Sequence, residues 1–325
     1  MAASVKLLIP QLHFFIATFS FAAFIVVSEM LIPYSKYVKI LKYLTLSLLA
    51  YIATAIIVGG NLDKILLTSI IPHFEFTPAF AMMFVVIFGA TLTPYAFFWQ
   101  ASQEAEEDVA KYKITEISAM DNSPRISKNE MRLMRSDVTI GMALSQLVMW
   151  AIIVTTAGSL HNHGITNIQT ADQAAKSLEP LVKTFPDAGE ISKTIFALGI
   201  IGTGLLAIPV LAGASAYALS DAFGWKQGLS KSFTRARNFH MVIAASTIIG
   251  LLINFTNYPI KALVYSAVIN GIVAVPILIA VMKIANDKKI LKDKINGRVS
   301  NVIGWITVVI MGIAVVILLF SWGHQ

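Results

Sequence analysis

Eight long stretches of this chain contain no Asp, Glu, Lys or Arg, and each of them holds at least 20 residues. A helix that crosses a bilayer needs about 20 mostly apolar residues, because the hydrocarbon core is about 30 Å thick and each residue advances about 1.5 Å. The chain therefore predicts an all-α transmembrane protein with a single transmembrane domain over residues 1–325. The predicted spans are residues 11–32, 40–59, 79–100, 138–158, 194–220, 241–257, 261–282 and 302–322.

Composition supports a bilayer as the solvent. Only 13% of the residues are charged and 56% are apolar, and a soluble domain normally carries about twice that charge. The chain has no Cys, which excludes disulfides, thiolate metal sites and cysteine nucleophiles. No predicted span holds paired acids, a His-Glu-x-x-His motif or a nucleophile with its base, so we do not expect an enzyme.

The basic residues alternate between the two sides of the predicted membrane. Loops after the first, third, fifth and seventh spans carry 19 of the 25 Lys and Arg residues, which predicts that these loops are cytoplasmic. This asymmetry accounts for the net charge of +7, and no nucleic-acid partner is expected. Both termini then lie outside, so we expect an odd number of further spans before residue 1.

Two loops stand out by length. Residues 104–136 are predicted to form a cytoplasmic loop, and residues 159–193 an extracytoplasmic loop with a short surface helix near 171–184. The cytoplasmic loop begins with an acidic run. Its members are compatible either with an inner vestibule that attracts cations or with a solvated helix extension, the interpretation we favour. They are Glu104, Glu106, Glu107 and Asp108.

The third predicted span contains a helix breaker. Gly89, Thr91, Thr93 and Pro94 lie near its middle. Pro94 has no N–H, so the carbonyl of Ala90 loses its helical partner. At this depth in a membrane, free backbone is tolerated mainly where it lines a cavity or a substrate site. A proline kink repaired by Thr hydroxyls and neighbouring helices is the alternative interpretation.

The string Gly-Ala-Thr-Leu-Thr-Pro-Tyr at residues 89–95 resembles the sixth helix of the NRAMP family of metal transporters, where Gly-Ala-Thr-x-Met-Pro-His is typical. Residues 97–104 are similar to bacterial members and to NRAMP-related magnesium transporters, and weaker similarities occur at 222–226, 269–271 and 297–298. The resemblance implies a partial LeuT-type (APC-like) inverted-repeat transporter fold in a bacterial inner (plasma) membrane. The eight spans would correspond to family helices four to eleven, with the first three lacking.

The resemblance also implies a metal site. The family's carbonyl ligand falls on Ala90 and its Met ligand on Thr93. A hydroxyl in place of a thioether favours a harder ion such as magnesium or manganese. Tyr95 and Gln100 take the positions of two His residues that the family ties to proton movement, and neither side chain titrates near neutral pH. We therefore treat Pro94, Tyr95 and Gln100 as ion-path or gating candidates, with protons as a candidate coupled ion.

Asn270 is a further ion-path candidate, in the seventh span beside Gly271. A buried Asn that bridges two helices is the other interpretation. No carboxylate lies centrally in any predicted span, and the Asp and Asn ligands of the family's first helix match nothing here. We therefore do not expect this chain alone to transport.

The predicted function is transmembrane transport of divalent metal cations, with the ion as substrate and no cofactor. One alternative is a LeuT-type symporter of amino acids or amines with a cation, although such a site usually has a Gly-rich break instead of Thr-Pro. The other alternative is a structural fragment without transport.

Overall fold

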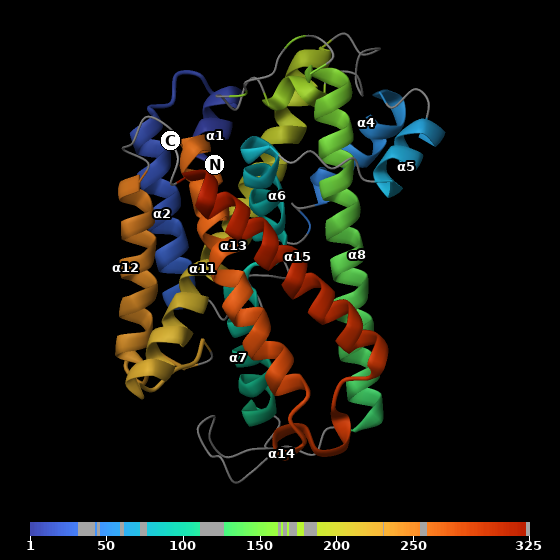
Figure 1. Ribbon diagram of the computed structural model, residues 1–325. Helices are drawn as coiled ribbons and strands as arrows, with labels where there is room; N and C mark the ends of the chain where they lie inside the picture. Colours follow the sequence, from blue (N-terminus) through green and yellow to red (C-terminus); the bar gives the residue numbers. More distant parts are fainter. Residues whose placement is uncertain are drawn as a thin grey trace. The chain divides into compact units, whose positions relative to one another are not determined.

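The computed structural model consists of α-helices and short 3₁₀ helices (Figure 1). It describes residues 1–31, 43, 46–58, 62–71, 77–110, 127–161, 164, 168, 174–178, 187–229, 231–253 and 259–322, and none of these residues lies in a strand. The helices group into two compact units, Met1–Ile70 with Phe98–Phe255 and Ile71–Phe97 with Thr256–Gln325. A single transmembrane domain over residues 1–325 stays a prediction.

Within the described residues, five helices are long and apolar enough to cross a membrane. They are Pro78–Asp108, which is interrupted at residues 92–93, and Asn129–Ser159, Glu190–Phe223, Ala262–Ala285 and Arg298–Phe320. Three shorter apolar helices are Phe14–Glu29, Leu46–Ile57 and Arg237–Leu252. Each of the eight overlaps one of the spans predicted from the sequence.

The first unit is built around α11. Its elements are α1 (Ala2–Leu8), α2 (Phe14–Leu31), η1 (Leu46–Leu49), α4 (Ala50–Val58), α5 (Leu62–Ile70), most of α7 (Pro94–Ala110), α8 (Lys128–Ser159), η3 (Lys176–Leu178), α11 (Ala188–Phe223) and α12 (Arg237–Ile253). Helix α11 packs against α12, α1 and η1, while α2 lies beside α12 (Figure 1). Helix α4 packs against α8.

Small and aromatic side chains fill the interior of the first unit. Around α4 and α8, the buried cluster contains Tyr51, Ala55, Ala151 and Phe196. The Thr155 hydroxyl donates to the Tyr51 carbonyl at 3.1 Å, which joins α8 to α4. This bond satisfies a polar group that would be costly to leave unpaired away from water.

The second unit contains α6 (Pro78–Thr91), α13 (Pro259–Ala285), α14 (Lys288–Leu291), η4 (Lys292–Lys294) and α15 (Arg298–Trp322). Helices α6, α13 and α15 pack against one another. Their shared core is made of Val85, Val268, Ala314, Val315 and Leu318. At the turn between α13 and α15, the amides of Asn286 and Asn301 donate to each other at 2.8 and 2.6 Å.

Helix α15 shows most clearly what surrounds these helices. Its face toward the unit carries buried residues such as Met311 and Leu318. The opposite face is also apolar and exposed at helical spacing, at Val302, Ile306, Val309, Ile313 and Phe320. A stripe of this length would be unfavourable in water, whereas acyl chains would cover it.

The connectors are shorter than predicted. Helix α7 continues to Ala110 and α8 begins at Lys128, so the loop predicted over 104–136 is narrower at both ends. The reason at α8 is a capping box, in which the Ser127 hydroxyl accepts the Glu130 N–H at 3.2 Å and the Glu130 carboxylate accepts the Ser127 N–H at 2.8 Å. Charged residues can continue a helix beyond the bilayer, because water solvates their side chains.

The predicted outer loop over 159–193 also differs from the structure. Helix α11 already begins at Ala188. Within the surface helix predicted near 171–184, the structure describes residues 174–178, where a 3₁₀ turn occupies Lys176–Leu178. The rest of that predicted helix lies outside the described residues.

Candidate functional site

The predicted break in the third span is present in the structure. Helix α6 ends at Thr91 and α7 begins at Pro94. Between them, Leu92 has φ −94° and ψ 60°, outside the helical region, although its N–H still donates to the Phe88 carbonyl at 2.7 Å. The helical course is therefore interrupted at Leu92 and Thr93.

Pro94 explains where the second helix starts. The first position of a helix needs no N–H donor, and the fixed φ of proline suits it. The Thr93 carbonyl accepts the Ala96 N–H at 3.0 Å and so begins the first turn of α7. The Thr91 hydroxyl donates to the Ile87 carbonyl at 2.7 Å inside α6. Of the two Thr residues, Thr93 is thus the one between the helices.

The candidates of the third span lie on both sides of this break. Ala90 is in the last turn of α6, and its carbonyl would need the N–H that Pro94 lacks. Thr93 is partly buried, Pro94 is buried and Tyr95 is partly buried in the first turn of α7. Gln100 is exposed further along α7. A main-chain carbonyl and a hydroxyl therefore flank one interruption of the helix.

Helix α13 crosses α6 just before the break. A Cβ added at Gly89 would collide with the Ala267 carbonyl oxygen. A Cβ added at Gly271 would lie 2.6 Å from Cγ1 and 2.8 Å from the carbonyl oxygen of Val85. The two backbones can approach this closely because both positions lack a side chain. Asn270 precedes Gly271 and is partly buried, so it lies in the turn of α13 that meets α6.

The break offers neutral oxygen atoms. Among the residues that the structure describes, there is no group of three or more His, Cys, Asp or Glu that could hold a metal ion. Carbonyl and hydroxyl oxygens are ligands that hard cations such as Mg²⁺ and Mn²⁺ accept. The chemistry of the break therefore fits a hard cation better than a soft one.

A polar contact between α7 and α11 was not predicted from the sequence. The Gln103 amide donates to the Tyr217 hydroxyl at 3.1 Å. The Tyr217 hydroxyl donates to the Glu106 carboxylate, and the Leu229 N–H donates to the same carboxylate at 2.8 Å. Glu106 thus accepts from α11 and from the segment between α11 and α12.

Aromatic packing surrounds this network. Trp99 meets Tyr217 edge to face, with ring centroids 6.0 Å apart. A Cβ at Gly213 would collide with the Trp99 ring. Tyr217 in turn packs on Phe239 of α12, with centroids 4.8 Å apart. Trp99 and the buried Tyr217 and Phe239 therefore join α7, α11 and α12 into one cluster.

For Glu106, the interpretation as part of a solvated acidic run is wrong. The signal that could have identified its role is the spacing of Trp99, Gln103 and Glu106. Residues at i, i+4 and i+7 share one face of a helix, and here that face carries an aromatic ring and two polar groups. The donor that matches this face is Tyr217, which lies in the apolar run of α11.

These observations define the class of the protein. Long apolar helices, outward apolar stripes and a broken helix characterise an α-helical integral membrane protein. The chain belongs to the Nramp family, because the family model described as Natural resistance-associated macrophage protein-like matches residues 1–321. The NRAMP resemblance inferred from residues 89–95 is thereby confirmed, as is the expectation of a transporter family instead of an enzyme family.

Curated relatives are more distant. The chain is 27% identical over 202 residues to "Divalent metal cation transporter MntH" of Klebsiella pneumoniae (strain 342), which covers 60% of this chain and 42% of the relative. It is 23% identical over 242 residues to the protein of the same name from Clostridium acetobutylicum, which covers 73% of this chain and 48% of the relative. The chain therefore spans less than half the length of these relatives.

Proposed function

We propose that the protein formed by this chain moves divalent metal cations across a bilayer, with the ion passing the break between α6 and α7. Membership of the Nramp family and the printed names of the relatives support this proposal. The observation that carries it is the interruption at Leu92 and Thr93, directly before Pro94, in the segment that resembles the family's sixth helix.

The proposal includes a fold and an orientation. The eight apolar helices correspond to family helices four to eleven of a LeuT-type inverted-repeat fold. The loops with 19 of the 25 basic residues face the cytoplasm, and the membrane is the bacterial inner membrane. Both points rest on the family resemblance and the charge asymmetry.

At the break, the carbonyl of Ala90 and the hydroxyl of Thr93 are the proposed ligands from this helix. Both are hard oxygen donors, so manganese or magnesium is the proposed substrate rather than a softer metal. Pro94 keeps the Ala90 carbonyl from being capped by a helical N–H. Asn270 lies in the turn of α13 that meets α6, where its amide can contribute one more neutral oxygen.

Proton coupling is assigned to neither Tyr95 nor Gln100. Both residues take positions where the family resemblance implies His, and neither carries an imidazole. We propose that these two residues line or gate the path through their size and hydrogen bonds. The amino acid symporter gains no support from this geometry, because the break contains Thr-Pro and not a run of glycines.

The first prediction concerns Thr93. Thr93→Met places a thioether at the break, so uptake of cadmium relative to magnesium should rise about tenfold, which corresponds to about 1.4 kcal/mol. The measurement is uptake of manganese, magnesium and cadmium, each alone and in competition, by cells that produce this chain together with any sequence encoded in frame before residue 1.

Thr307→Met is the matched control, because the Thr307 hydroxyl donates at 2.9 Å to the Ile303 carbonyl within α15 and so belongs to a different helix from the break. It should leave the ratio of cadmium to magnesium uptake unchanged. An equal ratio in the wild type and in Thr93→Met would contradict a ligand role for Thr93. Absence of metal-dependent uptake in the wild-type protein would contradict the proposed function itself.

A further inference from the structure

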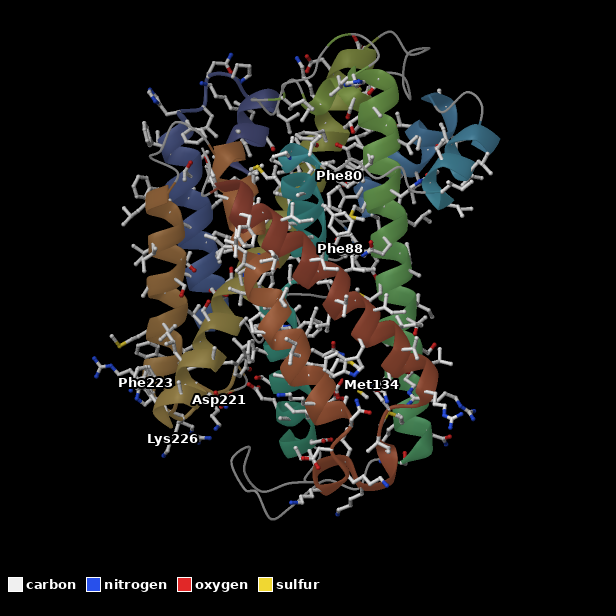
Figure 2. All side chains as sticks on the ribbon, in the orientation of Figure 1. Phe80, Phe88, Met134, Asp221, Phe223 and Lys226 are labelled. Atoms are coloured by element: carbon white, nitrogen blue, oxygen red, sulfur yellow. The ribbon has the colours of Figure 1, made fainter. Side chains whose placement is uncertain are left out.

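The end of α11 exposes aromatic side chains where the apolar helix stops. Gly224, with φ +66°, terminates α11 in the left-handed region, and the Trp225 N–H donates to the Ser220 carbonyl at 2.9 Å. Phe223 is 63% exposed and stacks on Trp225 with ring centroids 5.0 Å apart. Figure 2 shows Asp221, Phe223 and Lys226 together at this end of α11.

Four cationic side chains share this segment. All are exposed, and among the described residues none of them makes an ion pair. They are Lys226, Lys231, Arg235 and Arg237. Two acids lie beside this segment: Asp221 accepts the Gln227 amide at 2.6 Å, and Glu106 of α7 accepts the Leu229 N–H at 2.8 Å. The segment therefore presents a local excess of positive charge.

Buried neighbours fix the backbone that carries these charges. Gln227 is 7% exposed, and Ala236 and Phe239 are buried still more completely. The Leu229 N–H donates to the Glu106 carboxylate of α7. The anchors hold this segment to the first unit, and the four cationic residues between and beside them are exposed. The charged surface is thus part of the fold and not a loose tail.

A surface with these properties suits one environment. Aromatic residues favour the boundary between acyl chains and headgroups, and unpaired Lys and Arg near a bilayer attract anionic lipids. The apolar run of α11 ends at this point, which places the segment at the bilayer surface. We propose that residues 223–229 and 231–237 form a binding surface for anionic phospholipid headgroups, with Phe223 and Trp225 at the acyl boundary and the four cations on the phosphates.

Trp225 provides a local probe for the test. The purified protein is placed in nanodiscs that contain phosphatidylcholine and phosphatidylglycerol, with bromine on the acyl chains of one lipid or the other. The Trp225 signal is the difference in fluorescence between the wild type and Trp225→Phe. We expect brominated phosphatidylglycerol to quench this signal more than brominated phosphatidylcholine at equal mole fraction. Each single Lys or Arg to Gln change should lower the preference by up to about fivefold.

The decisive variant replaces all four cations by Gln and should remove the preference. A matched control replaces four Lys residues of the turn between α13 and α15, whose sequence is interrupted by Asp287 and Asp293 and has no aromatic residue; this control should keep the preference. Its substitutions are Lys288→Gln, Lys289→Gln, Lys292→Gln and Lys294→Gln. A charge-retaining variant that exchanges Lys and Arg at the four positions should also keep it, which separates charge from folding.

Three outcomes would overturn the proposal. The first is equal quenching by the two brominated lipids in the wild type. The second is a preference that survives in the four-Gln variant. The third is an equal loss of the preference in the control variant of the turn between α13 and α15, because the preference would then depend on basic charge in general and not on this segment. Metal uptake is not the readout, so failure of the transport proposal would leave this test unaffected.

Discussion

The two halves of the broken helix are held in different ways, each within its own unit. Helix α6 meets α13 through glycines, with Gly89 and Gly271 so close to the opposite backbone that no Cβ fits. Helix α7 is held through side chains, where Glu106 accepts from Tyr217 and Leu229 and Trp99 packs on Gly213. The contact of α6 with α13 depends on a short distance between the two backbones. The contact of α7 with its neighbours depends on Glu106 as a hydrogen-bond acceptor.

The difference teaches which kind of change each half tolerates. Close backbone packing fails when any atom is added, whatever its polarity. A hydrogen-bond network fails when an acceptor is removed, whereas an isosteric acceptor can preserve part of it. The stability of the α6 contact should therefore depend on the size of the substituted side chain. The stability of the α7 contact should depend on whether the substituted side chain can accept a hydrogen bond.

The largest expected effect is at the glycine contact. Gly89→Ala adds a Cβ that collides with the Ala267 carbonyl, so the free energy of unfolding should fall by about 3 kcal/mol. The measurement is thermal unfolding of the purified protein in detergent, with the fraction of monodisperse protein as a second readout.

Gly312→Ala is the control, since a Cβ at this position of α15 has nothing within 4 Å. It should be neutral or stabilising by about 0.5 kcal/mol, because Ala favours a helix over Gly. Equal destabilisation by both substitutions would show that the α6 contact is not special.

The next effect is at Glu106. Glu106→Ala leaves the Tyr217 O–H and the Leu229 N–H without their acceptor, and we expect a loss of about 2 kcal/mol. Glu106→Gln keeps a carbonyl oxygen and should lose less than half as much. Both values come from the same unfolding experiment.

Glu107→Ala changes the exposed neighbour of Glu106 on α7 and should alter stability by less than about 1 kcal/mol, the usual upper range for an exposed charged interaction. If Glu106→Ala were no worse than Glu107→Ala, then the network would not hold α7. If Glu106→Gln were as damaging as Glu106→Ala, charge and not acceptance would be the cause.

The smallest effect is at the amide pair of the second unit. Asn286 and Asn301 exchange two hydrogen bonds, and Asn286 also donates to the Met282 carbonyl at 2.8 Å. A double-mutant cycle of Asn286→Ala and Asn301→Ala should give a coupling of about 1 kcal/mol. Additive single effects would mean that the two amides do not stabilise the turn between α13 and α15 as a pair.

Much of the fold could be predicted because the features that a bilayer requires can be read from short stretches of sequence. Twenty uncharged apolar residues are enough to indicate a helix, and Pro94 is enough to indicate a break at a known position. The structure has an apolar helix at each of the eight predicted spans and ends α6 just before Pro94. The roles of Ala90, Thr93 and the other candidate residues stay predictions.

What could not be predicted depends on pairs of residues that are distant in sequence. The spacing of Trp99, Gln103 and Glu106 indicates a shared helix face, but it does not indicate that Tyr217 and the Leu229 N–H are the donors to Glu106. Likewise, Gly89 and Gly271 read as ordinary helix glycines until α6 and α13 are seen to cross. The helix ends were also missed, since the Ser127 capping box extends α8 into charged sequence that hydropathy assigns to a loop.

That capping box has a practical consequence. Helix α8 has 32 residues, which is roughly 48 Å of helix against a hydrocarbon layer of about 30 Å. The charged first turns of α8, which include the exposed Arg132 and Asp137, therefore extend beyond the bilayer into water as a rigid helix. An antibody fragment raised against this helical extension would bind in a fixed orientation and could serve as an alignment marker when particles are imaged by electron microscopy.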